Sequence, residues 1–142
     1  MKNKALFGFV AASIALQGCA GPKQEACWAP ETKQTVASLT RAVLLEQIEN
    51  LVKLGGAEIN EDRRKNIDQR TKVELSDYFV AGVDNDVNRL TCGATVRLTI
   101  DRPDNAVVHG ETSITFDIHK GEGGQLFSVP KGPLAQLVAG AE

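Results

Sequence analysis

The sequence predicts an α+β domain in which one long N-terminal helix packs on a four-stranded antiparallel meander sheet. Apolar residues recur at three- and four-residue spacing after residue 30, and beyond residue 70 they alternate with polar residues. Alternation of this kind is typical of an antiparallel sheet with one face packed and the other solvated. The single long helix is the only element big enough to cover such a sheet. Because the helical pattern comes before the alternating one in the sequence, the helix precedes the strands.

The helix is expected to begin at Pro30-Glu31-Thr32, because proline and an acidic residue both suit a first helical turn. Charged residues lie between its apolar positions and so fall on other faces. Gly55-Gly56 should end it, since glycine readily adopts the left-handed conformation that closes a helix. The apolar positions are Val36, Leu39, Val43, Leu44, Ile48, Leu51 and Val52.

Residues 57–70 are polar, and Asn60 is expected to cap a short solvated helix. The charge run that follows, from Glu61 to Lys65, has a second interpretation as a docking patch. The solvated face is favoured because the acids and bases of the run largely cancel.

Four strands are expected after residue 70, each with one apolar face. Turn-forming residues separate them at 84–86, 101–105 and 121–124. The second strand has the clearest alternation, and the fourth is short. The apolar faces are expected to hold Val73, Leu75, Phe79 and Ala81; Leu90, Cys92, Ala94, Val96, Leu98 and Ile100; Thr112, Ile114, Phe116 and Ile118; and Leu126, Phe127 and Val129.

The C-terminal segment from Pro130 to Ala139 is more apolar than a free tail would be. One interpretation is a final turn that packs against the sheet. The other is a partner-binding segment, because exposed apolar patches mark interaction sites.

The first 18 residues have the pattern of a secretion signal. Lys2 and Lys4 form a positive head, and the apolar run that follows, residues 5–16, is shorter than the roughly 20 residues that a spanning helix needs. The run ends in Leu16-Gln17-Gly18-Cys19, which resembles the lipobox of bacterial lipoproteins. That resemblance implies removal of residues 1–18 and lipidation of Cys19, although Gln17 stands where a small or hydroxyl residue is more usual. Ala20, in place of an acidic residue, implies sorting to the periplasmic side of the outer membrane in preference to retention at the inner membrane, and the inner membrane and the cell surface stay open as alternatives.

The expected organisation is therefore a signal peptide over 1–18, a lipidated cysteine with a short tether over 19–29, and one domain over 30–142. Seven residues between Cys19 and Cys27 reach about 25 Å at most, which keeps the domain near the bilayer. Residues 1–18 contain two lysines and no acid, so the remaining 124 residues have a formal charge of −4 instead of −2. An acidic chain lacks the basic surface that nucleic acid binding needs, so that class of partner is excluded.

Cys27 and Cys92 are predicted to form a disulfide, because two cysteines in an oxidising compartment usually pair. The alternative is two buried thiols. A metal site is disfavoured, since the two histidines lie elsewhere and no C-x-x-C spacing occurs. On the chain-entropy model, a bond closing a loop of this length contributes roughly 4 kcal/mol.

Two short patterns have the residue types of functional sites, but their spacing is wrong. Residues 84–88 place oxygen ligands as in the start of a calcium loop, yet the glycine and glutamate required further on are missing. Ser113, Asp117 and His119 include the three residue types of a catalytic triad. On one strand, however, Ser113 and His119 would lie about 20 Å apart. No catalytic residue, metal site or cofactor is therefore expected.

The order of elements from Glu31 to Pro130 resembles that of cystatin-like and small nuclear-transport-factor-like α+β rolls, and this resemblance assigns no functional residue. The expected function is a non-enzymatic protein-binding or accessory module of an envelope assembly, with an envelope protein as partner and the lipid on Cys19 as its membrane anchor. The alternative is a small-molecule carrier or weak enzyme with a pocket between helix and sheet. A filled core with an exposed edge strand or an exposed apolar tail would favour the first function, and a deep apolar cavity with convergent polar side chains would favour the second.

Overall fold

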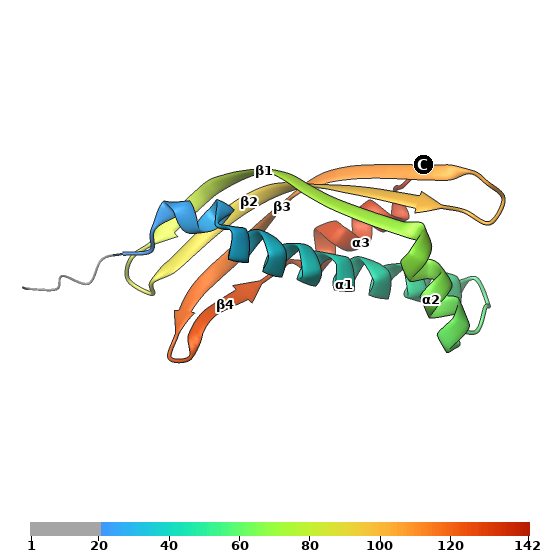
Figure 1. Cartoon of the computed structure of the whole chain (residues 1–142), viewed down its shortest axis with the longest axis horizontal. Helices are drawn as coiled ribbons and strands as arrows, with labels where there is room; N and C mark the ends of the chain where they lie inside the picture. The colour runs from blue at the N-terminus through green and yellow to red at the C-terminus, as the bar shows by residue number, and fades with distance from the viewer. Residues whose placement is uncertain (1–20) are drawn as a thin grey trace, which may run out of the picture.

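The computed structural model describes residues 21–142, so the predicted signal peptide and Cys19 lie outside the described residues. The α+β prediction, with the helix before the strands, is confirmed (Figure 1). The elements in chain order are η1 (Gln24–Trp28), α1 (Pro30–Leu54), α2 (Glu61–Arg70), β1 (Thr71–Asp84), β2 (Arg89–Asp101), β3 (Val107–Gly121), β4 (Gly124–Ser128) and α3 (Lys131–Ala139).

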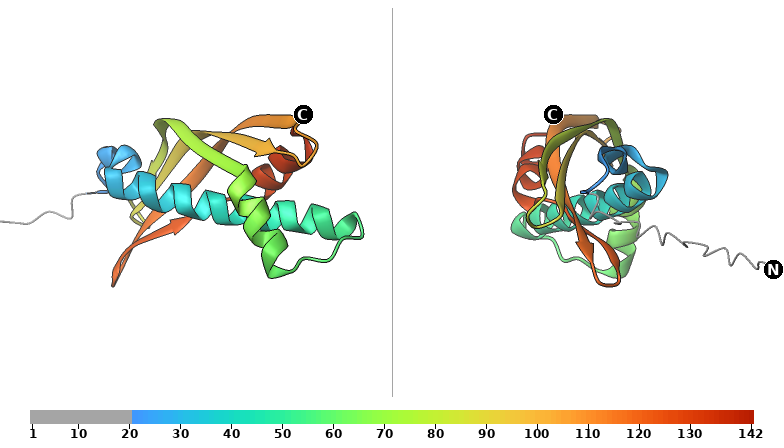
Figure 2. Two further views of the ribbon diagram at one scale, coloured as in Figure 1. Left: turned by 45° about the vertical axis from the view of Figure 1, so that its right-hand side comes forward. Right: turned by 90° about the vertical axis from the view of Figure 1, so that its left-hand side faces the viewer.

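The four strands form an antiparallel meander in the order β1-β2-β3-β4, so β1 and β4 are its edges. Helix α1 runs along one face of the curved sheet, and α3 lies beside α1 on the same face (Figures 1 and 2). The opposite face of the sheet carries no helix in these views. The molecule is thus two layers, with its core between the helices and the inner face of the sheet.

Helix α1 begins and ends as its sequence predicts. Pro30 stands in the first turn, and Gly56, with a φ of 84°, closes the C-terminal end. Thr32, Val36, Thr40, Leu44 and Ile48, at four-residue steps, form its buried stripe. Two positions of the predicted apolar face depart from this burial: the side chains of Leu39 and Leu51 are 38% and 45% exposed.

The core consists of two clusters of buried side chains that fill the space between the helices and the sheet. The first lies under the C-terminal half of α1 and the second under its N-terminal half together with η1. The first contains Leu44, Ile48, Val96, Leu98, Ile114, Leu134, Leu137 and Val138. The second contains Cys27, Val36, Leu90, Cys92, Ala94, Phe116 and Ile118.

Helix η1 places the start of the folded region before the boundary expected at Pro30. Cys27 is fully buried and bonded to Cys92 of β2, with an S–S distance of 2.05 Å and a Cα–Cα distance of 5.5 Å. The bond and the burial of Cys27 hold residues 24–28 against the sheet. Part of the segment predicted as tether, 19–29, is therefore structured.

Strand β1 contains a bulge that its sequence pattern did not reveal. Asp77 and Tyr78 together stand opposite Ala94 of β2, one residue more than a regular ladder allows. Asp77 has a φ of 51°, in the left-handed region that aspartate tolerates better than most residues. An extra residue reverses which face of the sheet the following side chains occupy, here as far as a second register shift between Val80 and Gly82.

The predicted apolar face of β1 is consequently wrong in the part of the strand that follows the bulge. Phe79 and Ala81 were expected to face the core, but both are exposed. Tyr78 and Val80 pack against the second cluster instead. The bulge therefore places a tyrosine, rather than a phenylalanine, beside α1.

Residues 61–70 form a solvated helix, and the C-terminal segment packs against the rest of the domain, which are the first interpretations given for each above. In α2, Asn60 Oδ1 accepts a hydrogen bond from the Arg63 N–H at 2.9 Å, and every α2 residue is exposed or half-buried. The C-terminal segment forms α3 and buries Leu134, Leu137 and Val138 against the core. Neither segment is a free extension of the domain.

Candidate functional site

The structure does not assemble the residues that resemble a catalytic triad. Asp117 Oδ1 accepts a hydrogen bond from the Thr91 hydroxyl at 2.6 Å, across from β2. His119 pairs in register with Arg89, and Ser113 lies four residues before Asp117 along β3. The three side chains therefore have separate surroundings on one strand.

The turn that resembles a calcium loop uses its carboxylate internally. Asp84 Oδ1 accepts hydrogen bonds from the N–H groups of Asp86 and Val87 at 3.1 and 3.4 Å, while its other oxygen lies 3.3 Å from Arg89 Nη2. This is the side-chain-to-backbone bonding of an aspartate turn. Within residues 21–142, no group of three or more His, Cys, Asp or Glu residues could hold a metal ion.

A groove runs between the N-terminal half of α1 and the edge strand β1. It has a volume of about 750 Å³ and is open to solvent along one side. Residues of η1, α1 and the β1 bulge line it, and we call it the α1–β1 groove. Its lining residues are Trp28, Lys33, Gln34, Ala37, Leu75, Ser76, Asp77 and Tyr78.

Aromatic rings and a cation shape this groove. The Lys33 ammonium lies 5.3 Å from the centroid of the Tyr78 ring, within the range of a cation–π contact. The Tyr78 ring meets Phe116 edge to face, with centroids 6.4 Å apart. Burial raises the pKa of the Tyr78 phenol above its ordinary value, because it disfavours the charged phenolate. None of the ion pairs within residues 21–142 includes Lys33.

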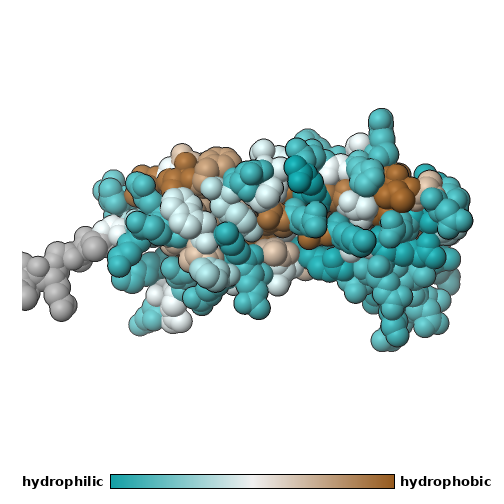
Figure 3. Space-filling view, turned by 45° about the horizontal axis from the view of Figure 1, so that its top comes forward, coloured by the Kyte–Doolittle hydropathy of each residue, from teal (hydrophilic) through white to brown (hydrophobic). Residues whose placement is uncertain are grey.

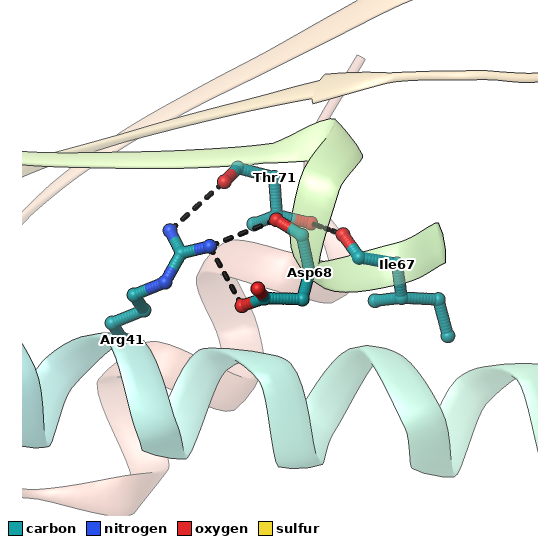
Figure 4. A network of polar contacts seen from close by, with 4 residues as sticks. All are labelled: Arg41, Ile67, Asp68 and Thr71. Carbon is teal, nitrogen blue, oxygen red and sulfur yellow. Dashed lines mark hydrogen bonds and ion pairs between the residues drawn. The ribbon is translucent and has the colours of Figure 1, made fainter. Parts of the chain in front are cut away.

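The arginine on α1 that closes one end of the β1 edge is Arg41 (Figure 4). Its Nη1 donates to the Thr71 carbonyl at 2.9 Å, and its Nη2 donates to the Asp68 carbonyl and carboxylate, each at 2.8 Å. The Thr71 hydroxyl donates to the Ile67 carbonyl at 2.7 Å. Arg41 thus fixes the junction between α2 and β1.

The bond from Arg41 also shows which peptide groups of β1 face outward. The Thr71 carbonyl accepts from a helix side chain, so it points away from β2. Peptide groups in an antiparallel strand point to alternate sides. Val73 and Leu75 therefore also direct their N–H and C=O groups to the open edge, where the described sheet has no further strand.

A second hollow, of about 760 Å³, lies between η1 and the hairpin joining β3 to β4. Its floor includes Ala26, Ala29, Leu90 and Ile118, and charged residues of both signs stand around it. Figure 1 shows η1 and this hairpin at the same end of the molecule. The charged groups on its lining do not share one sign.

Exposed apolar side chains are distributed over the surface. In Figure 3, hydrophobic patches alternate with hydrophilic side chains along the upper part of the molecule, and the lower right is almost wholly hydrophilic. Trp28 and Phe79 are 42% and 44% exposed, and Leu54, at the end of α1, is 83% exposed. Trp28 is the one of these that lines the α1–β1 groove.

Comparison of the chain with protein families, with characterised proteins and with solved structures finds no match. The resemblances to the lipobox and to the two α+β rolls therefore rest on the residues and the element order alone. Within residues 21–142, no helix combines the length and apolar character needed to cross a bilayer.

Sequence reasoning did not find the α1–β1 groove, because the groove depends on the bulge in β1. Two features of the sequence do point to the groove, one in its composition and one in its pattern. The chain has one tryptophan and one tyrosine, and both line the groove. Asp77 is the other signal, since it interrupts the apolar alternation of the strand at the position where the bulge forms.

Proposed function

We propose that this chain is a lipoprotein anchored through Cys19 to the periplasmic side of the outer membrane, and that its domain is a non-enzymatic protein-binding module. The partner is an envelope protein. The anchor rests on the signal-like run of residues 1–18 and on Leu16-Gln17-Gly18-Cys19. More than one acyl chain gives stable attachment, because each buried methylene contributes about 0.8 kcal/mol.

The observation that carries the binding function is an open edge strand beside a filled core. The two clusters occupy the space in which a carrier would need its ligand pocket. The α1–β1 groove instead lies at the side of the domain and adjoins outward-facing peptide groups of β1. An unpaired strand edge is a ready template for pairing with another chain.

The short connection to Cys19 supports a partner that lies close to the membrane. Helix η1 begins at Gln24, so four residues separate it from Cys19. At full extension such a segment spans about 15 Å. The α1–β1 groove includes Trp28 of η1 and so belongs to the same end of the domain.

Site-specific photo-crosslinking in the native envelope tests the binding function. A photoreactive residue replaces Gln34 in the groove, and in a control variant it replaces Lys53 at the far end of α1. We expect one protein to be crosslinked from position 34 and not from position 53. Equal yields from both positions, or adducts with lipid alone, would count against a protein-binding module.

A further inference from the structure

We infer that the α1–β1 groove binds an extended acidic segment of the partner protein, which adds as a strand to the open edge of β1. This inference rests on the proposed binding function and specifies the chemistry of the partner. It follows from three features of the groove: its outward peptide groups, its limited length and its unpaired cation.

The outward peptide groups select the conformation of the bound segment. Val73 and Leu75 each present an N–H and a C=O at the edge, two residues apart. An extended chain carries matching groups at the same spacing and forms the ladder hydrogen bonds. Helices satisfy their own peptide groups internally and cannot do so.

The length of the open edge limits what can bind. Arg41 occupies the Thr71 carbonyl at one end, and the bulge at Asp77 and Tyr78 interrupts the ladder at the other. The free window, residues 72–76, accepts a short segment. It is too short to pair with the whole β1 of a second copy, which has 14 residues.

The unpaired cation selects the charge of the segment. Lys33 lines the groove without a carboxylate partner among residues 21–142, whereas Asp77 accepts a hydrogen bond from the Ser76 hydroxyl at 2.8 Å. The indole of Trp28 is also a hydrogen-bond donor. An acidic side chain beside Lys33 would therefore meet an opposite charge, while a basic one at that position would meet a like charge. Asp77 keeps its negative charge, because the Ser76 hydroxyl is neutral, so the acidic residue of the segment is expected beside Lys33 and not beside Asp77.

Trp28 makes the groove observable, because it is the only tryptophan of the chain. The full lipidated protein is titrated with two short synthetic peptides that alternate valine with glutamate or with lysine. We expect saturable change in Trp28 emission with the acidic peptide only, and slower amide hydrogen exchange at Val73 and Leu75. Equal binding of both peptides, or no slowing of exchange, would overturn the inference.

Charge variants make the test specific to Lys33. Lys33→Glu should weaken binding of the acidic peptide by roughly tenfold, and Lys33→Arg should retain it. Lys53→Glu, at the exposed end of α1, changes the net charge equally and should leave binding unaltered. A similar loss in both glutamate variants would attribute the effect to net charge and overturn the role of Lys33.

Two outcomes separate this inference from the proposed function. A protein crosslinked from position 34 without any binding of the acidic peptide would refute the acidic strand and leave the binding module standing. Slow exchange at Leu75 that depends on protein concentration, without peptide, would replace the partner segment with a second copy and refute the inference.

Discussion

The aromatic ring of Phe79 on β1 lies over Gly93 of the neighbouring strand, in the space that a Cβ at position 93 would occupy. The two residues are in register in the sheet. A glycine inside a strand often marks such a close approach, and an aromatic ring covers the backbone that it exposes. The bulge turns Phe79 to the face of the sheet on which Gly93 lies. The contact between ring and glycine therefore depends on the bulge.

Gly93→Ala should be coupled energetically to Phe79. In the native background the new methyl group displaces the ring, whereas in a Phe79→Ala background alanine relieves the conformational entropy cost of glycine. We expect a coupling free energy of about 1–2 kcal/mol from a double-mutant cycle measured by chemical denaturation. Gly82→Ala is the control, because its nearest neighbour would be at 3.9 Å. Additive effects of the two substitutions would contradict the contact.

Gly110→Ala should loosen α3. A Cβ at position 110 would lie 2.7 Å from Leu137 Cδ1, so either the buried Leu137 side chain must change its rotamer or α3 must shift away from β3. Overpacking of this kind costs about 1–3 kcal/mol. We expect faster hydrogen exchange in α3 and at His109, whose peptide groups bond to Glu142.

Gly132→Ala is the matched control for this substitution, because no atom lies within 4 Å of the added Cβ. It stands in the first turn of α3 directly before Pro133, where the helix propensity of alanine is opposed by the clash of its Cβ with the proline ring. The stability of this variant should therefore lie within about 1 kcal/mol of that of the native protein. An equal loss of stability in both variants would mean that the effect of Gly110→Ala does not come from the contact between β3 and α3.

Arg41→Ala should destabilise the protein more than Arg64→Ala. Arg41 donates three hydrogen bonds at the junction of α2 and β1, two of them to carbonyl groups. Without Arg41 the Thr71 carbonyl loses this partner, whereas the Asp68 carbonyl still accepts the Thr71 N–H. We expect a loss of about 1–2 kcal/mol in the free energy of unfolding. Arg64 forms one exposed pair with Glu49, and such pairs contribute at most about 1 kcal/mol. Equal losses would show that the junction is not held by Arg41.

Tyr78 should ionise above the ordinary tyrosine pKa of 10.0, because its burial disfavours the phenolate. It is the only tyrosine, so ultraviolet absorbance of the phenolate reports it directly. A raised pKa in the folded state means that its contribution to stability is complete below pH 10.0 and is lost as the pH rises through the folded value. Tyr78→Phe should reduce this alkaline loss. A midpoint at or below the ordinary value would contradict the burial.

The sequence allowed the fold class to be predicted because its two periodicities are strong. The helix over 30–54 has a clear start at Pro30 and a clear end at Gly55-Gly56. The strand over 89–101 alternates without interruption. These signals are local, so a single sequence is sufficient to read them.

The candidate site was not predictable, because it depends on contacts between distant segments. The bulge at Asp77 changes the face of the β1 residues up to the second register shift, between Val80 and Gly82. Asp77 interrupts the apolar alternation, but a polar residue in a strand does not by itself show that the register has shifted. Likewise η1 is held by the Cys27–Cys92 bond across 65 residues, and the docking of α3 depends on the absent side chain of Gly110. In each case tertiary contact decides what local sequence leaves open.

The intact mass of the native product, purified from the envelope of its host, tests the central claim most directly. The claim predicts a chain that begins at Cys19 and carries the added mass of acyl groups on that residue. A Cys19→Ala variant should lose the added mass and the association with membranes. A product that retains residues 1–18, or that begins at Cys19 with an unmodified thiol, would contradict the claim.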